Sequence, residues 1–348
     1  RVGQHWMAPR PAPPSALHKR RGIGVACSWK NTGYSFGFDD KSTCRVELTL
    51  SAGAGRHGQP TAGGIERAIV KIGVAEVGQG TTTGLAQIAA ETLGLPLHCI
   101  DLIVSDTDIA PDAGSSSASR QLYVSGNAVR RACLKALDAY HGAAPGATSI
   151  AVEATFHARE QRPTTPFDPQ TGLCNPHVCV GWSANIVEVE VDIETGEVEL
   201  IAVYAAHDVG RAINRQLIEQ QIDGGVVMGQ GYGLMEDFVV DKGRILTRNL
   251  TEYLIPTALD APRTIRYVIV EEPDPTGPFG AKGVGEHTTI AVPPAILAAI
   301  HNATGVWLNS LPATAERVRA ALQQAAQTAQ EKRQERVAVP ARGSKQPE

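Results

Sequence analysis

The sequence lacks several features that mark familiar protein classes. It has no run of eighteen consecutive apolar residues, so no segment predicts a membrane-spanning helix. Its 32 lysines and arginines stand against 36 aspartates and glutamates, which leaves no basic excess for nucleic acid. The first residues lack the apolar core of a secretory signal peptide. These absences predict a cytoplasmic enzyme or binding protein.

Motifs for common metal and hydrolase sites are also missing. The six cysteines are scattered and none forms a C-x2-C pair, which excludes an encoded iron–sulfur cluster or structural zinc site. The histidines have no ligand spacing such as H-x3-H, and no G-x-S-x-G elbow predicts a serine hydrolase. The cysteines are therefore interpreted as small thiols in a reducing compartment.

The chain is long enough to predict two lobes, and its fold class is expected to be α+β, with mixed sheets and helices in each lobe. Of its 348 residues, 43% are hydrophobic. The glycine- and proline-containing segment 141–149 is the best boundary between lobes. The predicted organisation is an N-terminal arm at 1–21, a first lobe at 22–145, a second lobe at 146–326 and a disordered polar tail at 327–348.

Periodicity predicts the main elements of both lobes. Segments 22–29, 44–51 and 65–77 are rich in β-branched residues and favour strands. Segment 85–93 has apolar residues at helical spacing and ends at glycine and proline. Alternating valines and acids at 184–204, interrupted by "ETGE", predict a hairpin.

Four polar, glycine-rich loops could hold a ligand. "EVGQGTTTG" at 76–84 precedes a helix, whose free amides suit an anion, although an ordinary tight turn remains an equal alternative. "GSSSASRQ" at 114–121 offers hydroxyls that could cap the next helix or bind a polar cofactor. Gln230 lies between glycines, and "GPFGAKGVGE" surrounds Glu286 with backbone freedom. Together they predict a site for one large polar ligand.

In this order, four segments closely resemble one known family: "AEVGQGTTTGLAQIAAETLGLP", "AGSSSASRQLYVSGNAV", "HDVGRAIN…QIDGGVVMGQGYGLME" and "GPFGAKGVGE". The resemblance is to the C-terminal half of the molybdenum-binding subunit of the xanthine dehydrogenase/aldehyde oxidase family, over roughly 22–318. It implies the fold of that family's second molybdopterin-binding domain.

The resemblance also implies roles for individual residues. Glu286 would be the catalytic base beside the molybdenum, facing the metal centre without a protein partner. Phe36 would stack on the substrate, with Phe38 as its neighbour. No side chain would bind the metal, which the pterin dithiolene holds. The residues implied to bind the cofactor are Val77, Gly78, Gln79, Gly80, Ser115, Ser116, Ser117, Ser119, Gln230, Lys282 and Gly285.

Two departures from the family pattern bear on the site, and a third, Asn214–Arg215 in place of the usual Asn-Pro, is expected to affect only a turn. Ser115 and Ser116 replace the usual alanines, which would make the metal's surroundings more polar. The family's earlier half, with its own glycine-rich segments, has no counterpart here. The resemblance therefore implies partners: a second molybdenum-subunit chain that carries the rest of the site, a 2Fe–2S subunit and an FAD subunit. The molybdopterin is expected in its cytosine dinucleotide form if the source is bacterial.

Three functions stay open at this level. Hydroxylation of an N-heteroaromatic substrate, such as a purine or nicotinate-like ring, is preferred because Phe36 favours a flat molecule. Oxidation of an aldehyde or carbon monoxide on the same scaffold is the second reading. A non-catalytic scaffold or assembly subunit is the third, and the presence of Glu286, Gln79 and Gln230 argues against it.

Overall fold

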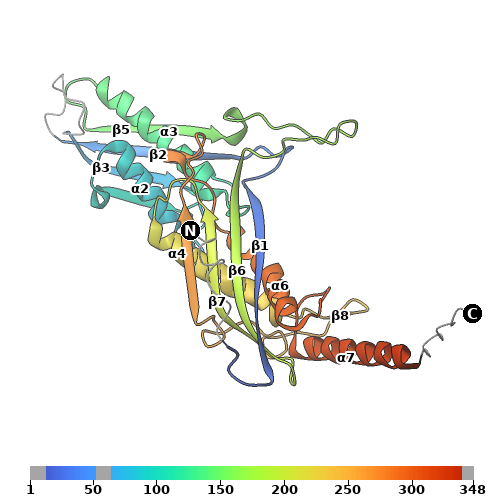
Figure 1. Ribbon diagram of the computed structural model, residues 1–348. Coiled ribbons are helices and arrows are strands. Elements are labelled where there is room, and N and C mark those ends of the chain that lie inside the picture. Colours follow the sequence, from blue (N-terminus) through green and yellow to red (C-terminus); the bar gives the residue numbers. More distant parts are fainter. Residues whose placement is uncertain (1–12, 52–63, 339–348) are drawn as a thin grey trace, which may run out of the picture.

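Two four-stranded mixed sheets form the framework of the protein (Figure 1). The computed structural model describes residues 13–51 and 64–338. Sheet A has the order β1 (Lys19–Thr32), β6 (Cys179–Asp192), β7 (Val198–Asp208) and β10 (Thr264–Val270). Sheet B has the order β4 (Ile100–Val104), β3 (Ile65–Ile72), β2 (Lys41–Leu50) and β5 (Ser149–His157). In each sheet one pair is parallel, β7 with β10 and β3 with β4, and the other pairs are antiparallel.

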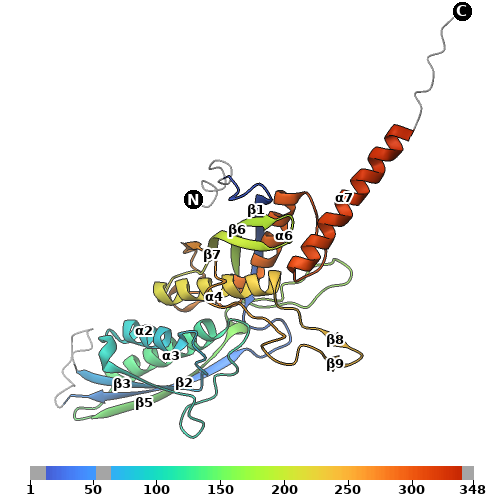
Figure 2. The same cartoon turned by 90° about the horizontal axis from the view of Figure 1, so that it is seen from below.

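Two helices, α2 (Thr81–Leu93) and α3 (Gln121–His141), cover one face of sheet B (Figure 2). Their buried residues recur at helical spacing, as Leu85, Ile88 and Ala89 do in α2. The strands contribute alternating buried residues such as Val46 and Val70 to the same core. The predicted α+β class, with mixed sheets and helices, is confirmed.

Sheet A packs against α4 (Arg215–Leu234) and α6 (Val292–Thr304). The strand β1 lies so close to α6 that two of its inward positions must be glycine. A Cβ at Gly22 would lie 2.2 Å from the carbonyl oxygen of Ala299, and one at Gly24 would lie 2.0 Å from that of Ala295. This face of β1 therefore meets the helices, while Val25 and Trp29 are exposed on the other face.

The remaining elements are short or peripheral. The short helix α5 (His287–Ile290) follows Glu286 directly. A two-stranded hairpin, β8 (Val240–Asp241) with β9 (Arg244–Ile245), lies on a segment that projects from the body (Figure 2). The helix α7 (Ala315–Ala338) also extends away from it (Figure 2). Single 3₁₀ turns occupy η1 (Leu97–Cys99), η2 (Ala158–Glu160) and η3 (Pro278–Gly280). Within the described ranges no helix is both long and apolar enough to cross a membrane.

The two sheets differ from the predicted lobe limits of 22–145 and 146–326. The strand at 22–29, expected in the first lobe, belongs to β1, which pairs along its length with β6 of sheet A. β5 follows the predicted boundary at 141–149 but pairs with β2 of sheet B. Local composition shows where the chain turns, whereas strand partners are decided by contacts far apart in the sequence.

Both chain ends also differ from the prediction. Most of the arm at 1–21 lies outside the described residues, and its last part, from Lys19, is already strand. The tail at 327–348 is helical as far as Ala338 rather than disordered. Its alanines, glutamines, lysines and arginines are strong helix formers, which the polarity of the segment concealed. The last ten residues lie outside the described part.

Candidate active site

A cavity of about 370 Å³ lies where loops from both sheets meet. We name three segments that line it: the glutamine loop (75–80), the serine loop (113–120) and the glycine loop (277–286). The beginning of α4 forms the fourth wall through residues such as Leu217 and Gln221. The cavity brings together these predicted site residues: Val77, Gln79, Gly80, Ser116, Ser117, Ser119, Lys282, Gly285 and Glu286. Gly78, Ser115, Gln230, Phe36 and Phe38 are not among its lining residues.

The glutamine loop is organised by a carboxylate that sequence reasoning overlooked. Glu76 accepts hydrogen bonds from the backbone amides of Gly78, Gly80 and Thr82 at 2.9, 2.9 and 3.0 Å. Although burial acts to raise its pKa, these bonds outweigh that effect and lower it. The helix N-terminus expected to hold an external anion therefore already holds an internal one.

The side chain of Gln79 is also engaged within its own loop. Its Oε1 accepts from the amide of Val77 at 2.7 Å, and its Nε2 donates to the carbonyl of Ala75 at 3.0 Å. Both polar ends of the side chain are thus satisfied. The structure therefore assigns Gln79 a part in shaping the loop, beside its position on the cavity wall.

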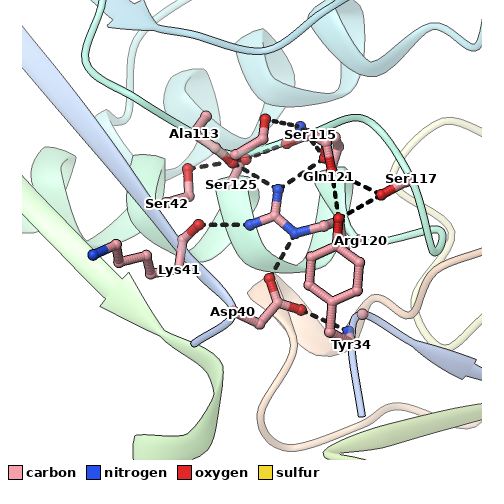
Figure 3. A network of polar contacts seen from close by, with 12 residues as sticks. Tyr34, Asp40, Lys41, Ser42, Ala113, Ser115, Ser117, Arg120, Gln121 and Ser125 are labelled. Atoms are coloured by element: carbon pink, nitrogen blue, oxygen red, sulfur yellow. Dashed lines mark hydrogen bonds and ion pairs between the residues drawn. The ribbon is translucent and has the colours of Figure 1, made fainter. Parts of the chain in front are cut away.

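A buried arginine holds the serine loop in place (Figure 3). Arg120 is 1% exposed and pairs with Asp40 at 2.6 Å. Its other nitrogens donate to the carbonyls of Ala113 and Lys41, both at 2.6 Å, and of Ser115 at 3.0 Å. One guanidinium therefore ties both ends of the loop to the start of β2.

Next to this network, Tyr34 anchors the serine hydroxyls (Figure 3). Its hydroxyl is hydrogen-bonded to Ser115 and, at 2.6 Å, to Ser117. The bond to Ser115, followed by that to Ser117, lowers the pKa of Tyr34. Beyond these serines the backbone takes φ values of 51° at Ala118 and 53° at Ser119, which are uncommon for non-glycine residues. Such strain is typical of loops that are held by their surroundings for a function.

The strained serine meets the glycine loop at Glu286. The hydroxyl of Ser119 donates to Glu286 Oε2 at 2.8 Å and accepts from the backbone amide of Glu286 at 3.0 Å. Lys30 Nζ, from β1, lies 3.1 Å from the same oxygen. The carboxylate is 48% exposed and has two protein partners, so the expectation that it lacks one is wrong.

Two other predicted cofactor residues have different surroundings. Lys282 is buried and pairs with Asp208 at 2.7 Å, so its charge is already matched within the protein. Gln230 is 5% exposed and donates from Nε2 to the carbonyl of Asp260 at 2.6 Å. Its Oε1 is buried without a hydrogen-bond partner among the described residues. An orphaned acceptor of this kind calls for a ligand or water.

Phe36 and Phe38 lie on the segment between β1 and β2, outside the cavity lining. They are 43% and 62% exposed. The guanidinium of Arg159 lies over the Phe36 ring at 5.7 Å, and Phe38 packs against Tyr34 with ring centroids 5.5 Å apart. Both rings are thus partly exposed, and Phe38 lies beside Tyr34, which is hydrogen-bonded to the serine loop.

Comparisons with known proteins identify the family. Residues 4–262 match a family model described as a molybdopterin cofactor-binding domain. The chain belongs to this molybdopterin cofactor-binding family.

Its relatives include molybdenum-binding subunits of the xanthine dehydrogenase type. It is 33% identical over 326 residues to a probable xanthine dehydrogenase subunit from Bacillus subtilis, covering 85% of this chain and 41% of that protein. It is 32% identical over 291 residues to the 6-hydroxypseudooxynicotine dehydrogenase complex subunit gamma of Paenarthrobacter nicotinovorans, covering 74% and 37%. The chain thus spans about two fifths of the length of these relatives.

The fold is shared with a solved aldehyde oxidoreductase. The structure superposes on the aldehyde oxidoreductase from Desulfovibrio gigas with a TM-score of 0.73 and 29% identity, covering 89% of this chain and 33% of the other. This agreement extends over most of both sheets and their helices.

The residues of the cavity fit a molybdopterin. The volume of the cavity lies in the range of small-molecule sites. The hydroxyl oxygens of Ser116, Ser117 and Ser119 line the cavity and can accept hydrogen bonds from a polar heterocycle. Gln230, whose Oε1 has no partner among the described residues, lies outside this lining. Among the described residues no cluster of three or more histidines, cysteines or acids could bind a metal ion directly.

Sequence reasoning missed four residues that support the loops and the carboxylate around this cavity: Lys30, Tyr34, Glu76 and Arg120. Arg120 lies within the motif at 114–121 and Tyr34 lies two residues before Phe36, and their large polar side chains beside small ones could have indicated a supporting role. Glu76 begins the quoted glycine-rich motif, and an acid before a helix N-terminus is a capping signal. Lys30 gives no local signal, because it meets Glu286 only where β1 packs against the glycine loop, far away in the sequence.

Proposed function

We propose that this chain forms the part of a molybdenum hydroxylase active site that carries the catalytic base, Glu286. The observation that supports this most is the convergence of three loops on one cavity with a carboxylate at its edge, in a fold shared with molybdenum enzymes. When bound, the cofactor would supply two-electron oxidation and a water-derived oxygen. The protein supplies binding, orientation and a proton acceptor.

Glu286 is arranged to accept a proton at one oxygen. Oε2 is engaged by Ser119 and Lys30, whereas no described residue contacts Oε1 within hydrogen-bonding distance. The engaged oxygen fixes the plane of the carboxylate and leaves Oε1 as the acceptor. A base held in this way transfers a proton efficiently when its partner lies within hydrogen-bonding reach.

The serine loop and Gln230 would hold the cofactor. Ser116, Ser117 and Ser119 present hydroxyls at the cavity, and Gln230 Oε1 lacks a partner in the described part of the chain. Gly78 and Gly80 would shape the glutamine loop beside it. A cytosine dinucleotide form of molybdopterin remains part of this proposal.

An N-heteroaromatic ring is the preferred substrate. The relatives include a probable xanthine dehydrogenase subunit and two proteins named probable hypoxanthine oxidase, and purine is the chemistry that those names share. Phe36 offers an exposed ring for stacking on a flat molecule. An aldehyde is the second candidate, supported by the aldehyde oxidoreductases among the similar proteins.

The rest of the site is proposed to lie on polypeptide outside these 348 residues, with 2Fe–2S and FAD subunits as electron carriers. The segment 238–259 supports such a partner, because it projects from the body (Figure 2) and exposes a run of large apolar side chains. We assign it to contact with the polypeptide that carries the remaining length of the relatives. The exposed residues are Phe238, Val240, Ile245, Leu246, Leu250, Leu254, Ile255 and Leu259.

Glu286→Gln in the assembled enzyme tests the proposal. The amide keeps the shape of the side chain and loses the base, so turnover should fall by at least about 100-fold. Molybdenum content and melting temperature should remain near those of the unaltered enzyme. The matched control is Glu91→Gln, at an exposed glutamate of α2, which should keep full activity. If Glu286→Gln keeps activity within about threefold of the unaltered enzyme, Glu286 is not the base.

A further inference from the structure

We infer that Lys30 is a positioning residue for Glu286: its ammonium group fixes the carboxylate of the base from the end of β1. This inference rests on the proposed function of Glu286 and extends it to a residue of strand β1, which is far from Glu286 in the sequence. It is carried by the contacts around Oε2.

The ammonium of Lys30 is itself held in one place. Its Nζ lies 3.1 Å from Glu286 Oε2 and donates to the carbonyl of Asn31 at 2.9 Å and to Asn31 Oδ1 at 3.1 Å. An ammonium has three donors, and these contacts use all of them. The side chain is 21% exposed, so it is less mobile and less screened than a typical surface lysine.

The fold explains why Lys30 reaches Glu286. Residues of even number in β1 face inward, as the close approach of Gly22 and Gly24 to α6 shows. Near the end of the strand the same face meets the glycine loop, where Thr32 Oγ1 accepts from the amide of Gly283 at 3.0 Å. β1 therefore contacts the glycine loop through Thr32 and through Lys30, two residues apart.

The other charged groups nearby do not share this role. Lys282 is paired with Asp208, and Arg120 is paired with Asp40. Of the described residues, Lys30 is the one cation within ion-pair distance of Glu286. Lys30 and Ser119 therefore hold the same oxygen from two sides, and removal of the lysine leaves a single hydrogen bond to orient the carboxylate.

Lys30→Met tests the inference, because it keeps the aliphatic stem and removes the charge. We expect kcat to fall by about tenfold to a hundredfold, as is typical of a misplaced catalytic group. KM should change by less than about threefold, since the substrate is not contacted. Lys30→Arg should restore at least about a third of kcat, because it returns a cation to the site. Molybdenum content should stay normal in both variants.

The matched control is Lys71→Met. Lys71 also forms a partly buried pair, 2.9 Å from Glu47 on the neighbouring strand β2, but lies outside the cavity lining. Lys71→Met should lower the free energy of unfolding as much as Lys30→Met does, and it should leave kcat unchanged. A crystal structure of Lys30→Met provides a readout independent of activity: the Glu286 carboxylate should lose its single orientation.

The outcomes are distinguishable from failure of the proposed function. If Glu286→Gln is inactive while Lys30→Met keeps kcat and an unchanged carboxylate, Lys30 is not a positioning residue and the base stands. If Lys30→Met and Lys30→Arg lose activity equally, the cation is not what matters and the inference is overturned. If Glu286→Gln retains activity, the proposed function itself fails.

Discussion

The serine loop and the glycine loop meet at Ser119 and Glu286, yet they are held by different interactions. The serine loop is fixed by charge, through the buried pair of Arg120 and Asp40 and the carbonyls that Arg120 binds. The glycine loop is fixed by close backbone packing. A Cβ at Gly283 would lie 2.1 Å from the carbonyl oxygen of Ser119.

The two kinds of support fail in different ways. A buried ion pair is costly to break, because one charge is left without a partner in a medium of low polarity. A close backbone contact fails instead when any side chain is added. The two loops can therefore be disturbed separately, although both position the same carboxylate.

The largest effect is expected for Arg120→Met, which removes the brace of the serine loop. Asp40 would remain buried without its cation, and three carbonyls would lose a donor. We expect the free energy of unfolding to fall by about 3–5 kcal/mol. Chemical denaturation of the purified protein measures it, and molybdenum content should fall with it.

Arg67→Met is the control for this substitution. Arg67 pairs with Asp101 at the surface, where side chains are 54% and 39% exposed. The loss there should be less than about 1 kcal/mol. Equal losses for the two arginines would show that the buried network does not hold the serine loop.

A decrease in pH should destabilise the part of the core behind the glycine loop, where His207 and His287 are buried. Burial, with a contribution from His287, lowers the pKa of His207 to about 3. Burial, followed by Lys30 and Lys282, lowers the pKa of His287 to about 4. Both rings lie in the core, 5.1 Å apart, without hydrogen-bond partners in the described part of the chain.

The direction of the pH dependence follows from the difference in proton binding between the folded and the unfolded chain. Below about pH 6.5 the unfolded chain protonates both histidines while the folded protein does not, so stability falls as pH decreases from about 6.5 towards 4. At about pH 5.5 the loss should be about 2–3 kcal/mol relative to about pH 7.5. Denaturation curves across this range measure it, and His207→Gln should reduce the dependence by about half. A flat profile over this range would contradict the assignment of two buried neutral histidines.

Gly283→Ala should disturb the glycine loop without touching a charge. The new methyl group would collide with the backbone of Ser119, and overpacking of this kind costs about 1–3 kcal/mol. Because Ser119 holds Glu286, kcat should fall more than stability alone explains. Gly224→Ala, in an open position on α4, is the control and should be neutral or slightly stabilising. Equal behaviour of the two variants would argue against close packing at Gly283.

The sequence predicted one loop better than the other for a physical reason. Glycines indicate close approach, so the loop around Glu286 could be recognised from the sequence alone. Arg120 follows four serines and an alanine, and nothing in its spacing shows that Asp40, eighty residues earlier, neutralises it. The helix α2 and the hairpin of β6 and β7 were predictable because their periodicity is local.

Long-range pairing set the limit of prediction for the fold. The assignment of β1 to sheet A and of β5 to sheet B depends on partners that lie about a hundred residues away or more. Lys30 likewise meets Glu286 through a contact between segments far apart in the sequence, so the one cation at the base within the described residues could not be found from its neighbours in sequence. The fold class could be predicted from local sequence patterns, whereas the assignment of each strand to a sheet depended on long-range contacts.

The smallest expected effect concerns Phe36 and Phe38, the aromatic residues on the segment between β1 and β2. If Phe36 stacks on a flat substrate, Phe36→Ala should lower kcat/KM for ring substrates by about tenfold, the equivalent of roughly 0.5–1.5 kcal/mol of stacking with lost apolar contact. Aldehydes without a ring should be affected less.

Phe38→Ala is the matched comparison, because Phe38 is more exposed and packs against Tyr34, which is hydrogen-bonded to the serine loop. It should change both substrate classes alike, through the serine loop. Since both phenylalanines are at least 43% exposed, neither substitution should lower stability greatly. Equal losses on ring and non-ring substrates in Phe36→Ala would show that Phe36 does not stack on the substrate.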